Sequence, residues 1–145
     1  MTGSHQVYGG EGNDTLIGSA SSDTLFGGEG ADIIQGGEGD NTLYAGGGVD
    51  TITAGSGDDI VYGEAGKNTI DLGDGTNTLF GGSGSDNVVA GSGADTLYGA
   101  EGEDSLAGGS GVDYLDGGQG ADLLQGQDGD DILAGEKEMM HLKAV

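Results

Sequence analysis

The residues best suited to chemistry in this sequence are fourteen aspartates and asparagines that recur at every ninth position. Eleven are Asp and three are Asn: Asp14, Asp23, Asp32, Asn41, Asp50, Asp59, Asn68, Asn77, Asp86, Asp95, Asp104, Asp113, Asp122 and Asp131. They offer oxygen ligands, which suit hard cations such as calcium, whereas zinc and copper prefer the nitrogen of His or the sulfur of Cys. The chain has no Cys and only two His, near its opposite ends. The series therefore predicts calcium binding, with backbone carbonyls of the adjoining turns completing each site.

The net charge also indicates a cationic partner. The chain carries 26 acidic and 3 basic side chains, for a formal net charge of -23, and it contains no Arg. So negative a chain lacks the basic surface that nucleic acids and anionic membranes require. No apolar run is long enough to span a membrane. We therefore expect neither nucleic-acid binding nor membrane insertion.

A nine-residue repeat sets the spacing of these residues. It runs from Gly9 to Ala134 in fourteen units without insertion or deletion. The eighth residue of every unit is aliphatic, and the fourth residue is Gly in every unit except one, which has Ser21. The first six residues of a unit, GGEGND in the first, have the composition of a turn, and the last three form a short strand. Alternation along that strand sends the eighth side chain to one face and the seventh and ninth to the other.

Stacking of these units predicts the fold. Low hydrophobic content with high charge ordinarily indicates disorder, but stacked repeats bury a shared core. Two units make a turn of 18 residues, with each unit forming half a circuit. We therefore predict an all-β fold, a parallel β-roll with two facing short-stranded parallel sheets and about seven turns over residues 9–134. At about 4.8 Å per strand, the roll would be about 34 Å long.

The same stacking places the sixth-position residues in two columns, one along each edge of the roll. Carboxylates about 5 Å apart repel one another strongly unless a cation lies between them. Seven turns leave six gaps in each column, which predicts up to about 12 Ca²⁺ ions. Their combined charge of about +24 would nearly balance the net charge of -23.

The repeat resembles the RTX (repeats-in-toxin) nonapeptide, GGxGxD followed by x-aliphatic-x. The resemblance covers residues 9–134 and implies a right-handed β-roll in which the sixth-position Asp and turn carbonyls bind calcium. It also implies a secreted, extracellular bacterial protein that is exported unfolded by type I secretion and folds on meeting calcium. Units 18–26, 63–71 and 72–80 depart from the motif, so the resemblance supports calcium binding less strongly near those turns.

The two ends of the chain differ from the repeat. Residues 1–8 continue its register as a degenerate half-turn, with His5 in the sixth place and Val7 in the eighth. Residues 135–145 have a helix-forming composition, and we expect them to cap the open end of the core through Met139, Met140 and Leu142. A targeting signal or a partner-binding helix is the alternative for this segment.

Six of the seven aromatic residues occupy ninth positions at intervals of 18: Tyr8, Phe26, Tyr44, Tyr62, Phe80 and Tyr98. This spacing predicts an aromatic ladder on one face of the roll. The ladder has two interpretations. It stabilises the roll by cross-strand packing, or it is a contact surface for a second copy, a parent domain or a glycan.

The leading hypothesis is a calcium-binding structural module that folds on calcium binding and supports the secretion and rigidity of an extracellular bacterial protein. The alternative is a surface-binding or adhesive module that uses the aromatic and threonine face. Ice is a less favoured ligand, because the third and fifth positions carry no regular array of Thr or Asn. We do not expect an enzyme, because every Asp has many equivalents and no His lies in register with a Ser.

Overall fold

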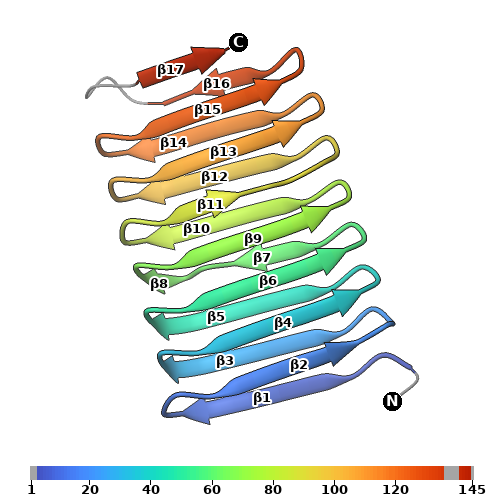
Figure 1. Cartoon of the computed structure of the whole chain (residues 1–145). Coiled ribbons are helices and arrows are strands. Elements are labelled where there is room, and N and C mark those ends of the chain that lie inside the picture. The colour runs from blue at the N-terminus through green and yellow to red at the C-terminus, as the bar shows by residue number, and fades with distance from the viewer. Residues whose placement is uncertain (1–2, 136–140, 145) are drawn as a thin grey trace.

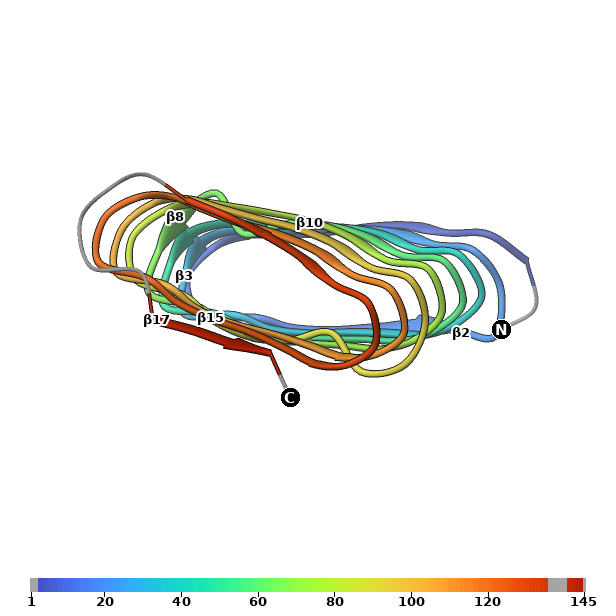
Figure 2. The same cartoon turned by 90° about the horizontal axis from the view of Figure 1, so that it is seen from above.

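The computed structural model describes residues 3–135 in full and the backbone of residues 141–144. The chain winds into a stack of flattened turns, and the strands that pair within each sheet are parallel (Figure 1). Viewed from above, the turns overlie one another as an elongated loop (Figure 2). This confirms the predicted parallel β-solenoid of about seven 18-residue turns. Within the described residues there is no helix, and so none that could span a membrane.

Two parallel sheets form the long sides of the turns. The first sheet contains β1 (Gln6–Glu11), β3 (Thr24–Gly30), β5 (Thr42–Gly48), β7 (Ile60–Tyr62), β8 (Ala65–Gly66), β10 (Thr78–Ser83), β12 (Thr96–Glu101), β14 (Tyr114–Gln119) and β16 (Ile132–Ala134). The second contains β2 (Thr15–Ser19), β4 (Ile33–Glu38), β6 (Thr51–Ser56), β9 (Thr69–Asp74), β11 (Asn87–Val89), β13 (Ser105–Ser110), β15 (Leu123–Asp128) and β17 (His141–Ala144). Paired residues are 18 apart, as Leu25 and Leu43 are.

Most strands are longer than the three residues that the repeat suggests. Strand β4, for example, covers the last three positions of one unit and the first three of the next. The turn proper is therefore only the fourth to sixth positions. Some glycines that resemble turn residues in the sequence lie in the sheet. Gly37, for example, has a φ of 103° and still pairs with Ser19 in the parallel ladder, because glycine tolerates a positive φ.

The fourth position shows why glycine is required. A Cβ added to Gly30 would lie 2.0 Å from the carbonyl oxygen of Gly12 in the preceding turn, and Gly30 has a φ of 137°. No side chain fits so close to a neighbouring backbone. The backbone at the second position also has a positive φ in every unit except that of Ser19, even at Glu64, Ala100 and Gln127. Fourth-position glycine thus lets successive turns approach backbone to backbone.

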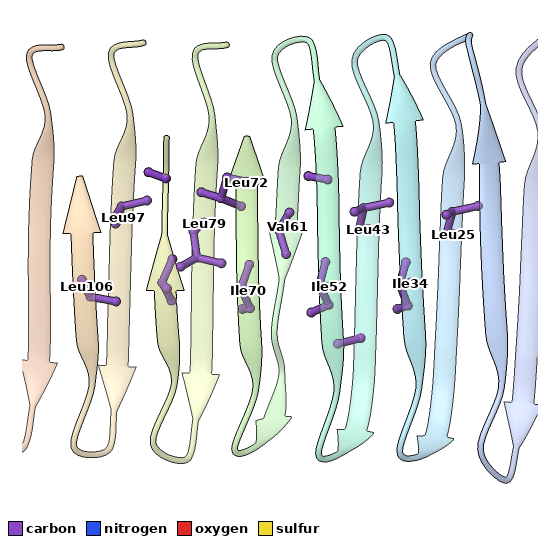
Figure 3. Close-up of a cluster of buried hydrophobic side chains, with 14 of the residues drawn as sticks. Leu25, Ile34, Leu43, Ile52, Val61, Ile70, Leu72, Leu79, Leu97 and Leu106 are labelled. Atoms are coloured by element: carbon purple, nitrogen blue, oxygen red, sulfur yellow. The ribbon is translucent and has the colours of Figure 1, made fainter. Parts of the chain in front are cut away.

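The core consists of the eighth-position aliphatic side chains, which point inward from both sheets (Figure 3). From Leu16 to Leu124 they are at most 3% exposed. The core also holds first-position residues that sequence reasoning did not assign to it: Ala45, Ala54, Leu72 and Ala90. Since each strand continues into the next unit, alternation places the first position on the same side as the eighth.

The helical character expected of the C-terminal segment is wrong for the residues that the structure describes there. Residues 141–144 form strand β17, which pairs in parallel with β15 and sets Leu142 beside Leu124 in the 18-residue register. A helix of this length is marginal, whereas an open sheet edge offers backbone partners at once. Met139 and Met140 lie outside the described residues.

The predicted aromatic ladder is confirmed. From Tyr8 to Tyr98, successive ring centroids along the outer face of the first sheet are 4.6 to 5.5 Å apart, and the planes are within 11° of parallel. The seventh aromatic residue, Tyr114, extends the ladder as a tilted neighbour of Tyr98. Each interior ring has both faces covered by its neighbours, so only ring edges face outward.

We predict that Tyr62→Thr destabilises the calcium-loaded roll about twice as much as Tyr8→Thr. Tyr62 stacks on two rings, Tyr44 and Phe80, whereas Tyr8 stacks on one. At about 0.2–1 kcal/mol per pair, the expected losses are about 0.4–2 and 0.2–1 kcal/mol in the free energy of unfolding. Chemical denaturation in calcium measures both. Equal losses for the two variants would contradict a ladder that stabilises through pairwise stacking.

Candidate metal centre

The fourteen sixth-position residues lie in two columns at the turns, as the repeat predicts. Those from Asp23 to Asp122 are buried, with 1 to 5% of their surface exposed, and Asp14 and Asp131 at the ends are partly buried. Such burial of acidic side chains is unusual, because a carboxylate in a protein interior needs a partner for its charge.

Except at Asp14, one oxygen of each side chain accepts a hydrogen bond from a backbone N–H. The N–H of Asp14 donates to Oδ1 of Asp32 at 2.8 Å, and the N–H of Asp32 donates to Oδ1 of Asp50 at 2.8 Å. The pattern continues along both columns to Asp122 and Asp131, with distances of 2.7 to 3.0 Å. Sequence reasoning missed this role. It also explains why Asn occurs in the columns, because its Oδ1 accepts the same bond.

The second oxygen has no hydrogen-bond partner in nine of the aspartates. Among the described residues these buried Oδ2 atoms belong to Asp14, Asp32, Asp50, Asp59, Asp86, Asp95, Asp104, Asp113 and Asp131. An unpaired buried carboxylate oxygen costs several kcal/mol in an ionised group. The columns therefore require either protons or cations at these atoms.

The space around these oxygens suits a cation. A Cβ added to Gly9 would lie 2.8 Å from Oδ2 of Asp14 and 2.4 Å from the carbonyl oxygen of Gly27 in the next turn. A carboxylate oxygen and a carbonyl oxygen from different turns thus approach one point beside the glycine, and both are ligands that calcium prefers. The same pairing of atoms recurs at Gly27, Gly81 and Gly99.

The acidic side chains do not converge on one another. Within residues 3–135 no group of three or more His, Cys, Asp or Glu side chains is arranged to hold a metal ion. The arrangement instead repeats a single carboxylate oxygen beside backbone carbonyls at each turn. These residues therefore fit the calcium ligands that the sequence predicts, a sixth-position side chain together with turn carbonyls.

Comparison with known proteins identifies the family to which this repeat belongs. The model of the RTX calcium-binding nonapeptide repeat matches four segments, residues 8–43, 44–79, 80–115 and 107–137. The chain belongs to the RTX calcium-binding repeat family. No curated protein matches it. The family supports calcium as the ion that the chain binds.

Burial raises the pKa of several RTX aspartates, because it disfavours the charged form. The pKa of Asp95 and that of Asp104 rise from 3.8 to about 6, and nearby carboxylates add to the effect. Burial also raises the pKa of Asp50, Asp59, Asp86 and Asp113. The metal-free roll therefore holds carboxylates that take up protons at a higher pH than exposed aspartates do.

Asp23 is the exception in these columns. Burial acts to raise its pKa, but hydrogen bonds from Ser19 and His5 outweigh burial and lower it. Ser19 donates to Oδ2 through its N–H at 2.6 Å and its Oγ at 2.8 Å, while the N–H of His5 donates to Oδ1 at 2.7 Å. The sequence showed only that unit 18–26 departs from the motif, not that its serine serves the carboxylate.

We predict that acid stabilises the metal-free roll. The folded pKa values of about 6 at Asp95 and Asp104 exceed the ordinary value of 3.8, so the folded chain binds protons before the unfolded chain does. Stability without calcium should therefore rise as the pH falls through about 6 towards 4, and be lowest above 6. Far-UV circular dichroism in calcium-free buffer at pH 7 and pH 5 measures this.

The double variant Asp95→Asn/Asp104→Asn is the control for that measurement. It removes two of the carboxylates with raised pKa and keeps the Oδ1 acceptors, so its ordered fraction should change less between pH 7 and pH 5. A β signal in the wild type that is the same at both pH values would contradict the prediction.

Proposed function

We propose that this RTX chain is a structural module that folds when calcium binds, and that this folding supports the secretion and rigidity of an extracellular bacterial protein. Family and fold support a calcium-binding structural module. The observation that carries the finer proposal is the series of nine buried carboxylate oxygens without hydrogen-bond partners.

Those oxygens strongly lower the free energy of unfolding of the metal-free chain. Nine carboxylates lie in the two columns with an unpaired oxygen, and the core that opposes this cost has one aliphatic side chain per half-turn, with four first-position additions. Each buried, unpaired ion costs several kcal/mol, while a whole domain has a net stability of about 5–15 kcal/mol. The chain without calcium should therefore be largely unfolded at neutral pH.

We assign the ligands to Oδ2 of the nine unpartnered aspartates and of Asp122, together with first-position carbonyl oxygens of the following turn. A Cβ added to Gly117 would lie 2.4 Å from Oδ2 of Asp122, the same distance as from Gly99 to Oδ2 of Asp104. This donor set is all oxygen and comes from flexible turns, so calcium fits it better than magnesium, which demands six short bonds and loses water reluctantly.

Secretion follows from the same property. The RTX family is typical of secreted bacterial proteins. A chain that stays unfolded until it meets calcium passes through a narrow exporter as an extended polypeptide and becomes rigid outside. We propose no catalytic role, because the acidic residues repeat along the columns and each one's environment resembles its neighbours'.

The aromatic ladder favours stabilisation over sugar binding. Sugars stack on exposed ring faces, and here the interior rings cover one another's faces at 4.6 to 5.5 Å. Tyr8, which is 65% exposed, has one stacked neighbour and therefore one uncovered face. We propose that the ladder of Tyr8, Phe26, Tyr44, Tyr62, Phe80 and Tyr98 is an internal support of the roll.

We predict that the chain shows little β structure in chelator at pH 7, becomes fully ordered in calcium and responds poorly to magnesium. Far-UV circular dichroism follows the backbone, and near-UV circular dichroism follows the tyrosines of the ladder, which should acquire fixed stacking only in calcium. A complete β signal in chelator would show that the unpaired carboxylates do not require calcium, and the proposal would fail.

A further inference from the structure

Asparagine and aspartate place different atoms at the same point of the turn. A Cβ added to Gly81 would lie 3.0 Å from Oδ2 of Asp86, and a Cβ added to Gly63 would lie 3.3 Å from Nδ2 of Asn68. A first-position carbonyl oxygen of the next turn lies beside both points, at 2.6 and 2.4 Å. The amide nitrogen of Asn68 therefore stands where Asp86 has its unpartnered oxygen.

With an amide nitrogen in place of a carboxylate oxygen, the turn of Asn68 needs no positive charge. The amide has hydrogens to donate, and Nδ2 of Asn68 donates to the carbonyl oxygen of Gly63 at 3.1 Å. In the other column, Nδ2 of Asn41 donates to the carbonyl oxygen of Gly39 at 2.8 Å. At these two turns a protein hydrogen already satisfies a carbonyl oxygen, and no carboxylate charge remains to be balanced.

Asp23 reaches the same result by another route. It keeps its carboxylate, but Ser19 occupies a second position that is left-handed in every other unit, and both its N–H and its hydroxyl donate to Oδ2. His5 supplies donors to Oδ1. Both oxygens of Asp23 are therefore partnered, unlike those of the nine aspartates described above.

We propose that Ser19, Asn41 and Asn68 replace the cation with hydrogen-bond donors at their turns, so that calcium binds at the ten aspartates assigned above but not at these three turns. This inference rests on the proposed function. It divides the roll into turns that need calcium and turns whose buried polar atoms are satisfied by hydrogen bonds within the protein. The number of bound ions is then lower than the predicted 12.

Asn68→Asp tests the proposal directly. It exchanges the donating amide for a carboxylate oxygen and recreates the arrangement of Asp86, so the variant should bind more calcium ions than the wild type and be less ordered in chelator. Asn87→Asp is the matched control: it adds the same charge on the exposed outer face of β11 and should leave the number of ions unchanged. Native mass spectrometry in calcium counts the ions.

Asn41→Asp and Ser19→Gly repeat the test in the other column, and either decides the question where Asn68→Asp fails to fold in calcium. Ser19→Gly restores the second-position glycine and removes the hydroxyl from Asp23, so it should also gain an ion. A higher count in the folded variants, with an unchanged count in Asn87→Asp, supports the proposal.

The two proposals fail differently. A wild type that binds calcium, with variants that bind the same number of ions or fewer, overturns this inference and leaves the proposed function intact. A wild type that binds no calcium overturns the proposed function and this inference with it.

Discussion

The structure depends on a buried side chain whose two oxygen atoms have different tasks. At the sixth position, Oδ1 accepts the backbone N–H of the residue 18 places earlier, which fixes the register of the stack. In nine aspartates Oδ2 is left without a donor, which creates the demand for positive charge. One residue type thus joins the geometry of the roll to its ionic requirement. Asn68 separates the two tasks, because its Oδ1 still accepts the N–H of Asp50 while its second atom is a donating nitrogen.

Glycine makes this arrangement reachable. With no side chain at the fourth position, the backbones of successive turns come close enough for carbonyl oxygens to lie beside the carboxylates. The unit with Ser19 and Ser21 shows the alternative: neither residue adopts the left-handed conformation, and the serine donates to the carboxylate instead. Unit 18–26 therefore lacks both the second- and fourth-position glycines and the unpaired carboxylate oxygen.

The fold and the two columns could be predicted because the repeat is uninterrupted, so that register in the sequence equals register in space. The length of the strands could not, since residues such as Gly36 and Gly37 have turn composition although they pair within β4. For the same reason, the sequence does not predict that Leu72 lies in the core. Strand β17 was foreseeable, because Leu142 lies 18 residues beyond Leu124, but composition favoured a helix.

The hydrogen bonds at the candidate site were beyond sequence reasoning for a different reason. No pattern of residue types distinguishes the two oxygens of a carboxylate, and the partners of Asp23 depend on the backbone conformation of Ser19. Units 18–26 and 63–71 depart from the motif in the sequence, which predicts poorer calcium sites there. In the structure, Asp23 and Asn68 of these units have hydrogen-bond partners within the protein instead.

The constant separation of 18 residues between paired strands also determines how the roll responds to a mechanical load. Each turn touches only the turns before and after it, as β12 lies between β10 and β14 in its sheet. Tension applied at the two ends acts first on a terminal turn, whose detachment releases 18 residues, about 60 Å of extended chain. The next turn then meets the load with the same contacts that the lost one had. The molecule is therefore a series of nearly equal links that yield in succession, and it dissipates work over many small steps.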